Sequence, residues 1–266
     1  MKSLPILALA AAAWAGAAQA QDAPPAPSAA AHYYSLPAAA PGKPRPWVVI
    51  LPGGGGIKVQ DDDRVYFDAA RHWNAQGYDA LIIHYQAVWN SMPGATDGAT
   101  GQREARVFAD AMAVARERGW IDGQCPGLVV GYSMGGEGAL TLATDGASGL
   151  AGAIAYYPSV KGQSGPYAPA VPLLVLQGTA DQVATEADLD RFLTRATGPG
   201  RISVERYPDA HHGFDIPSIP VLRQINGLPF LYNATYAAAA TRAADAFARQ
   251  AVAADPRAAA CATPDI

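Results

Sequence analysis

The segment 131–136, Gly-Tyr-Ser-Met-Gly-Gly, contains the residues of this chain that are best suited to chemistry. It follows an apolar run and opens a segment with helical periodicity, so Ser133 falls on a sharp turn between a buried strand and a helix. Gly131 and Gly135 allow neighbouring backbone to approach this strained turn. The context predicts that Ser133 is a nucleophile. The alternative is a glycine-rich turn that carries an inert serine.

A serine hydroxyl is a poor nucleophile at neutral pH, so the chain must also supply a base and an acid that orients it. Asp181 follows the apolar run 173–177, and the pair His211 and His212 follows the run 202–207. Both loops lie at the carboxyl ends of predicted strands, where ligands bind in sheets of parallel strands. We therefore predict that Asp181 orients one of these two histidines.

Two other aspartates compete for the acid role. Asp209 and Asp215 lie so close in sequence to the histidine pair that their side chains would have to fold back across the same loop. Asp209 also follows Pro208, as expected of a turn residue. Asp181 approaches from a neighbouring strand, and we favour it for this reason.

Metal chemistry is not predicted. The remaining histidines are scattered along the chain, and each is expected to be a surface or a hydrogen-bonded core residue: His32, His72 and His84. The two cysteines, Cys125 and Cys261, are too few and too far apart for a zinc site.

A tetrahedral intermediate would need backbone N–H donors for its negatively charged oxygen. Met134, the residue after the serine, supplies one. The other should come from the segment 52–56, Pro-Gly-Gly-Gly-Gly, and Gly54 is the candidate. A phosphate-binding interpretation of these glycines fails because neither the P-loop pattern nor the dinucleotide-binding pattern with its acidic partner is present.

Short apolar runs alternate with longer amphipathic segments from residue 47 onward. The predicted strands are 32–36, 47–51, 80–85, 128–132, 153–157, 173–177 and 202–207, and the predicted helices are 63–76, 102–118, 133–143, 186–196 and 234–254. Most strands are continuously apolar, which indicates a sheet covered on both faces. The alternation predicts an α/β protein with a mostly parallel, doubly wound sheet.

These motifs resemble those of the dienelactone hydrolase family of α/β-hydrolases, over roughly residues 48–254. Members of that family carry the catalytic histidine just before a small residue and a phenylalanine, as in His212-Gly213-Phe214. The resemblance therefore selects His212 as the base and expects His211 to face away from Ser133. The segment 66–78 is similar to the family's helix that leads into a strand. In the family a histidine commonly precedes the glycines; Pro52 stands there instead.

The resemblance implies the α/β-hydrolase fold and hydrolysis of carboxylic esters or lactones, with no metal and no cofactor. The name-giving enzymes carry a cysteine nucleophile, so Ser133 favours general ester hydrolysis. Two alternatives stay open. One is a serine peptidase similar to prolyl oligopeptidases, which usually carry a gating domain that would have to precede Trp47. The other is a non-catalytic binding protein with the same fold.

Substrate contacts are predicted on loops at the carboxyl edge of the sheet. Trp89 and Met92 lie on a long loop and are wall candidates, with Tyr132 beside the serine and Phe214 beside the histidine. The alternative is that these side chains cover the edge of the core. The segment 158–172 between two strands is too short for a large lid domain, so we expect an open site.

The N-terminus predicts export. Lys2 is followed by an apolar stretch and by Ala18-Gln19-Ala20, which is typical of a secretory signal peptide (residues 1–20) cleaved after Ala20. An uncleaved membrane anchor is the alternative. Residues 21–31 read as a disordered leader, and 32–266 as a single domain that is periplasmic or secreted.

An oxidising compartment permits a disulfide between the two cysteines. Cys125 precedes the strand that leads to Ser133, at the edge of the sheet opposite the predicted site. The last helix runs back toward that edge, and Cys261 lies just beyond its end. A Cys125–Cys261 disulfide is therefore expected.

Composition restricts the partners. A net charge of −4, a pI near 5.7 and the lack of a Lys/Arg-rich stripe argue against nucleic acid. No apolar run in residues 40–266 approaches the ~20 residues of a membrane-spanning helix. We expect a monomer whose partner is a small or oligomeric ester substrate.

Overall fold

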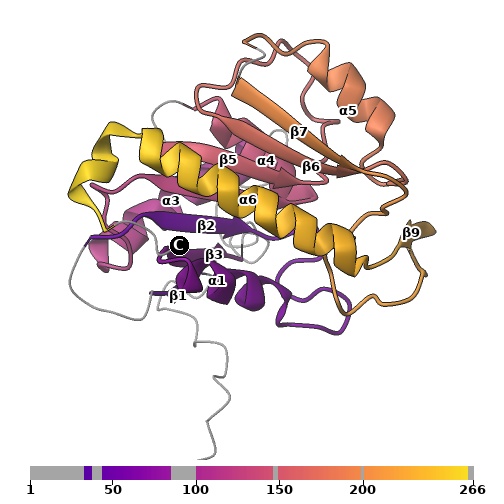
Figure 1. Cartoon of the computed structure of the whole chain (residues 1–266), viewed down its shortest axis with the longest axis horizontal. Helices are drawn as coiled ribbons and strands as arrows, with labels where there is room; N and C mark the ends of the chain where they lie inside the picture. Colours follow the sequence, from indigo (N-terminus) through magenta and orange to yellow (C-terminus); the bar gives the residue numbers. More distant parts are fainter. Residues whose placement is uncertain (1–32, 38–43, 85–99, 146–148, 199–200, 263–266) are drawn as a thin grey trace, which may run out of the picture.

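A seven-stranded sheet forms the centre of the molecule, as a computed structural model shows (Figure 1). The structure describes residues 33–37, 44–84, 100–145, 149–198 and 201–262; the predicted signal peptide and leader lie outside these residues. The strand order is β1-β3-β2-β4-β5-β6-β7, with β1 antiparallel to β3 and every other pair parallel. The strands are β1 (Tyr33–Leu36), β2 (Trp47–Leu51), β3 (Asp79–Ile83), β4 (Gly127–Tyr132), β5 (Leu150–Tyr156), β6 (Leu173–Gly178) and β7 (Ile202–Tyr207).

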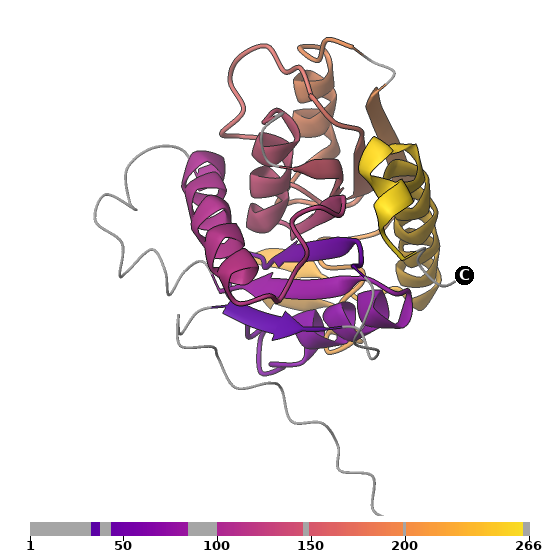
Figure 2. The ribbon, with the colours of Figure 1, turned by 90° about the vertical axis from the view of Figure 1, so that its left-hand side faces the viewer.

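Helices cover both faces of this sheet. Figure 2 shows α1 and α6 on one side and α3 and α4 on the other. The helices are α1 (Val65–Ala75), α3 (Thr100–Glu117), α4 (Met134–Ala143), α5 (Glu186–Leu193), α6 (Ala234–Ala254) and the 3-10 helix η2 (Pro256–Ala260). The predicted doubly wound α/β architecture of the α/β-hydrolase type is confirmed.

The double cover explains the apolar strands. In β2, Val49 packs into the core beneath α3 and α4, whereas Val48 and Ile50 pack into the core beneath α1 and α6. Successive side chains of a strand point to opposite faces, so each must be apolar when both faces are buried. The edge strand β7 differs, since its Ser203 and Glu205 are exposed.

Several boundaries differ from those predicted. Strand β5 starts at Leu150 instead of residue 153, because its small residues also pair with β4. Helix α5 ends at Leu193 instead of residue 196. The end of the predicted strand 80–85 at Tyr85 lies outside the described residues.

A hairpin that the sequence analysis did not predict lies in the segment 214–233. It consists of β8 (Arg223–Ile225) and β9 (Leu228–Phe230). Asn226 and Gly227 connect the strands, and both have a positive φ, 52° and 77°. Asn-Gly is the residue pair that favours this kind of tight turn.

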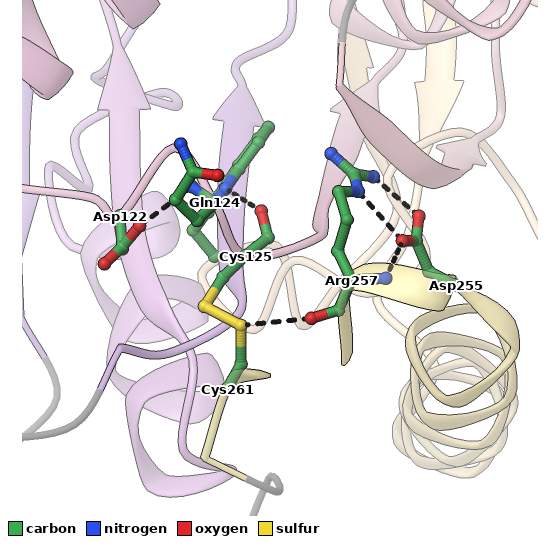
Figure 3. The surroundings of a disulfide bond; sticks show 7 residues. Asp122, Gln124, Cys125, Asp255, Arg257 and Cys261 are labelled. Carbon is green, nitrogen blue, oxygen red and sulfur yellow. Dashed lines mark hydrogen bonds and ion pairs between the residues drawn. A yellow bond between two sulfur atoms is a disulfide. The ribbon is translucent and has the colours of Figure 1, made fainter. Parts of the chain in front are cut away.

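The predicted disulfide is present (Figure 3). Cys125, just before β4, is bonded to Cys261, just after η2, with a Cα–Cα distance of 5.8 Å. Trp47 donates a hydrogen bond from Nε1 to the carbonyl oxygen of Cys125 at 3.0 Å. The disulfide therefore ties the C-terminal segment to the edge of the sheet opposite the carboxyl ends of the strands, and it is compatible with export. Within the described ranges, no helix has both the length and the apolar character to cross a membrane.

Candidate active site

Ser133 lies at the turn between β4 and α4, in a backbone conformation that few residues adopt. Its φ is 55° and its ψ is −110°. An ideal Cβ on Gly131 would lie 2.0 Å from the carbonyl oxygen of Gly135, and one on Gly135 would lie 2.1 Å from that of Leu51. Only glycine fits at these two positions, so they permit the strained turn that presents the serine hydroxyl.

A chain of hydrogen bonds joins the three residues predicted to act together. Nε2 of His212 lies 2.8 Å from Oγ of Ser133, and Nδ1 of His212 lies 2.7 Å from Oδ2 of Asp181. His212 is 3% exposed and Asp181 is 4% exposed. The other oxygen of Asp181 accepts hydrogen bonds from the N–H groups of Val183 (2.7 Å) and Ala184 (2.9 Å). These bonds hold the carboxylate in the orientation that the histidine requires.

The competing residues lie elsewhere. Asp209 is an exposed turn residue with a φ of 56°, and its N–H donates to Oγ1 of Thr179. Nδ1 of His211 is 3.2 Å from the carbonyl oxygen of Ala180. Asp215 accepts a hydrogen bond from the hydroxyl of Tyr157 at 2.7 Å. Asp181 is therefore the carboxylate that contacts His212.

The two predicted oxyanion donors lie side by side. Met134 is the first residue of α4, and the first N–H groups of a helix have no partner within the helix. An ideal Cβ on Gly54 would lie 3.1 Å from Cε of Met134, so the glycine loop passes directly along this residue.

Tyr66 supports the glycine loop from the start of α1. Its buried hydroxyl accepts a hydrogen bond from the N–H of Gly53 at 2.8 Å. The family's histidine is absent before these glycines, and Pro52 gave no indication of what replaces it. The tyrosine of a neighbouring helix holds the loop, and no local sequence signal identified it.

We expect Tyr66→Phe to lower kcat/KM for ester hydrolysis about tenfold, because the N–H of Gly53 would lose its buried acceptor and the loop would loosen. The measurement is steady-state hydrolysis of p-nitrophenyl acetate. Tyr207→Phe is the matched control, since the Tyr207 hydroxyl is buried without a hydrogen-bond partner among the described residues. Equal kinetics of the two variants would contradict the assigned role of Tyr66.

The imidazole of His212 is held between two aromatic rings. Its centroid lies 4.5 Å from that of Tyr157, which follows β5, and 5.0 Å from that of Phe230 in β9. The sequence analysis predicted a contact with the histidine for neither residue. For Phe230 the Asn226-Gly227 turn was an available signal, because a hairpin there returns the chain toward the histidine.

Asp215 carries an unfavourable charge. Burial raises the pKa of its carboxyl from 3.8 to about 6, although the hydrogen bond from Tyr157 lowers it. The ionised form therefore costs stability, and this cost is absent below pH 3.8, grows between pH 3.8 and 6, and is complete above pH 6.

We expect Asp215→Asn to raise the free energy of unfolding at pH 8 by about 2 kcal/mol, since about two pKa units are involved. The gain should shrink toward zero as the pH falls to 4. Urea unfolding in phosphate buffer at several pH values measures it. Asp61→Asn, at a fully exposed position, is the control that should show no such change. A wild-type protein more stable than Asp215→Asn at pH 8 would refute the prediction.

Two of the four predicted substrate contacts lie within the described residues, and both are buried. Trp89 and Met92 lie outside the described residues. The prediction for Phe214 was wrong, because its side chain is 0% exposed and packs between Tyr157 and Tyr207. Tyr132 also belongs to the core: it is 7% exposed and its ring stacks on that of Tyr156. The tight turn at Ser133 directs the neighbouring side chain into the sheet.

No group of three or more His, Cys, Asp or Glu side chains that could hold a metal ion occurs in the described part of the chain. His72, one of the scattered histidines, instead contacts Asp245 through Nε2 at 2.7 Å and so links α1 to α6.

The model of the dienelactone hydrolase family matches residues 31–252. The chain belongs to this family. Membership of this family, together with the geometry of the site, identifies the protein as a carboxylic ester hydrolase.

Solved structures agree on the fold. A protein from Klebsiella pneumoniae assigned as a dienelactone hydrolase shares 19% identity and superposes with a TM-score of 0.62, covering 82% of this chain and 92% of that one. Esterase 2 from Thermogutta terrifontis, phosphoramylated by tabun, shares 18% identity with a TM-score of 0.57, covering 81% and 87%. Its propionate-bound form gives 18% identity and a TM-score of 0.55 over the same shares. A search of curated proteins finds no match.

Proposed function

We propose that this family member is an exported serine hydrolase that cleaves carboxylic esters or lactones through an acyl-enzyme. The observation that carries the proposal is the hydrogen-bonded chain from Asp181 through His212 to Ser133 at a strained strand-to-helix turn. A nucleophile, a base and an orienting acid are the three groups that acyl transfer to serine requires.

In the first half of the reaction, Oγ of Ser133 attacks the ester carbonyl carbon while its proton passes to Nε2 of His212. The N–H of Met134 and that of Gly54 donate to the oxyanion of the tetrahedral intermediate. Asp181 accepts the hydrogen bond from Nδ1 of His212 and stabilises the imidazolium. The intermediate collapses, the bond to the alcohol oxygen breaks, and the leaving alcohol takes the proton from Nε2.

In the second half, water attacks the acyl carbon and gives a proton to Nε2 of His212. The second tetrahedral intermediate expels Oγ of Ser133, which recovers that proton, and the carboxylic acid leaves. A lactone follows the same steps, with the alcohol and the acid remaining in one molecule.

Short acyl groups are the substrates we favour. The rings of Tyr157 and Phe230 crowd His212 on two sides. The Thermogutta esterase has been solved with propionate and with butyrate bound, which are short carboxylates. For export, the support is the predicted signal peptide and the Cys125–Cys261 disulfide.

The test is hydrolysis of p-nitrophenyl esters of increasing acyl length by the purified protein, combined with fluorophosphonate labelling mapped by mass spectrometry. We expect turnover of the shortest esters and label only on the peptide that contains Ser133. Cleavage of a proline p-nitroanilide without ester turnover would favour the peptidase alternative. A folded sample with neither turnover nor label would overturn the proposal in favour of a binding protein.

A further inference from the structure

A cavity lies between α1 and α6. Figure 2 shows these two helices on one face of the sheet. Its volume is about 300 Å³, at the lower end of the range typical of small-molecule sites. We call it the α1/α6 cavity; its walls include Trp73, Tyr132, Tyr156, Asp215 and Asp245. Neither Ser133 nor His212 lines it, although Asp215 accepts a hydrogen bond from Tyr157, whose ring packs on that of His212.

Two buried tyrosines, Tyr132 and Tyr156, line this cavity. Tyr132 and Tyr156 are 7% and 5% exposed, and their rings stack with centroids 4.8 Å apart. Among the described residues, neither hydroxyl is within hydrogen-bond distance of a partner, although both side chains form the wall. Neither oxygen is among the fully buried polar atoms of the described residues, so both hydroxyls can bond a molecule that enters the cavity, water included.

The charged side chains in the wall of the cavity are mainly negative. Four aspartates line the cavity, and no lysine or arginine of the described part does so. Asp245 pairs with His72, and Asp68 pairs with Arg64 and Arg71 outside the wall. Asp215 receives only the neutral hydroxyl of Tyr157 from a side chain, and no cationic side chain of the described residues forms an ion pair with it.

The volume of the cavity and the side chains of its wall indicate what kind of cation fits. No cluster of metal-binding side chains occurs among the described residues, and the volume far exceeds that of one bare ion. Aromatic rings attract organic cations, and Trp73, Tyr132 and Tyr156 provide such rings beside the carboxylates. An ammonium group would also donate the charged hydrogen bonds that carboxylates accept best.

We propose that the α1/α6 cavity is a binding site for a small organic molecule that carries a protonated amine. The ammonium group binds the carboxylate of Asp215, and the apolar body of the ligand packs against the aromatic wall. The two tyrosine hydroxyls complete the hydrogen bonding of polar groups on the ligand. The test measures ligand binding and therefore does not depend on the proposed catalytic activity.

The test uses two probes of nearly equal shape, benzylamine and benzyl alcohol, in isothermal titration of the full-length purified protein in phosphate buffer. We expect benzylamine to bind at least about tenfold more tightly than benzyl alcohol, because only the amine is charged. Asp215→Asn should remove this preference, and Tyr156→Phe should weaken benzylamine binding several-fold. Asp61→Asn, which neutralises an exposed carboxylate outside the cavity, is the matched control and should bind as the wild type does.

Equal affinities for the two probes, or no binding of either at millimolar concentration, would overturn the proposal and leave a cavity that holds water only. An unchanged preference for benzylamine over benzyl alcohol in Asp215→Asn would overturn the proposed contact between the ammonium group and Asp215. Asp62→Asn is a second, independent variant. Asp62 lines the cavity from the loop before α1 and has no ion-pair partner among the described residues. Its neutralisation should lower the preference for benzylamine several-fold.

Discussion

Replacing Ser133 with alanine is expected to lower kcat for p-nitrophenyl acetate by about 10⁵-fold, while the free energy of unfolding changes little. The hydroxyl is the only group of the site placed to form the acyl-enzyme, since Nε2 of His212 is 2.8 Å from Oγ and no other side-chain oxygen bonds that nitrogen within the described residues. The remaining groups could still hold a carbonyl oxygen and a water molecule, so a small residual rate is expected.

Ser203→Ala is the matched control for this variant. Ser203 is exposed on the edge strand β7 and forms none of the hydrogen bonds of the site, so its loss should leave kcat unchanged. Urea unfolding of both variants distinguishes a lost nucleophile from a lost fold. A Ser133→Ala protein that is folded and retains a tenth or more of the wild-type rate would exclude serine-based acyl transfer.

Removing the disulfide is expected to cost about 4–5 kcal/mol of stability in the chain-entropy model, because the bond closes a very long loop. Cys125 and Cys261 are separated by 136 residues in sequence. The variant is the double substitution Cys125→Ala and Cys261→Ala, since Cys125 is fully buried and alanine adds no polar group there. The measurement is the free energy of unfolding in urea, without and with a reductant.

The reductant provides the internal control. It should lower the stability of the wild type to that of the double variant and leave the variant itself unchanged. Hydrolysis of esters under native conditions should be nearly unaffected, because Cys125 precedes β4 and Ser133 follows it, at opposite ends of the strand. A loss below about 1 kcal/mol would mean that the unfolded chain is already compact enough to offset the entropy of loop closure.

Where a functional residue follows a strand, its place could be predicted from the sequence. Ser133, Asp181 and His212 each lie in the turn or loop that follows a strand, and parallel strands bring their carboxyl ends to one edge of the sheet. Strand and helix signals are local, so the fold class and these three positions were accessible. The same topology placed the two cysteines together at the other edge.

What the tertiary structure alone decided depends on contacts between distant segments. Tyr66 supports the glycine loop from another element, and Tyr157 and Phe230 hold the imidazole from two different strands or their ends. Nothing near Tyr66 or Tyr157 in the sequence marks the contact, and the Asn226-Gly227 turn near Phe230 indicates a hairpin but not its partner. Phe214 shows the reverse case, since its position beside the histidine suggested a substrate contact and packing buried it completely.

The α1/α6 cavity arises in the same way. Its carboxylates and hydroxyls come from two helices, two strand ends and two loops, and each residue is ordinary in its own stretch of sequence. Periodicity states which face of a helix is apolar, but it does not state how closely two helices approach or which polar groups are left between them. The sequence by itself therefore determined the order of the elements and the placement of Ser133, His212 and Asp181 after the ends of strands. The side-chain packing, which depends on all elements at once, decided the support of the site and the space beside it.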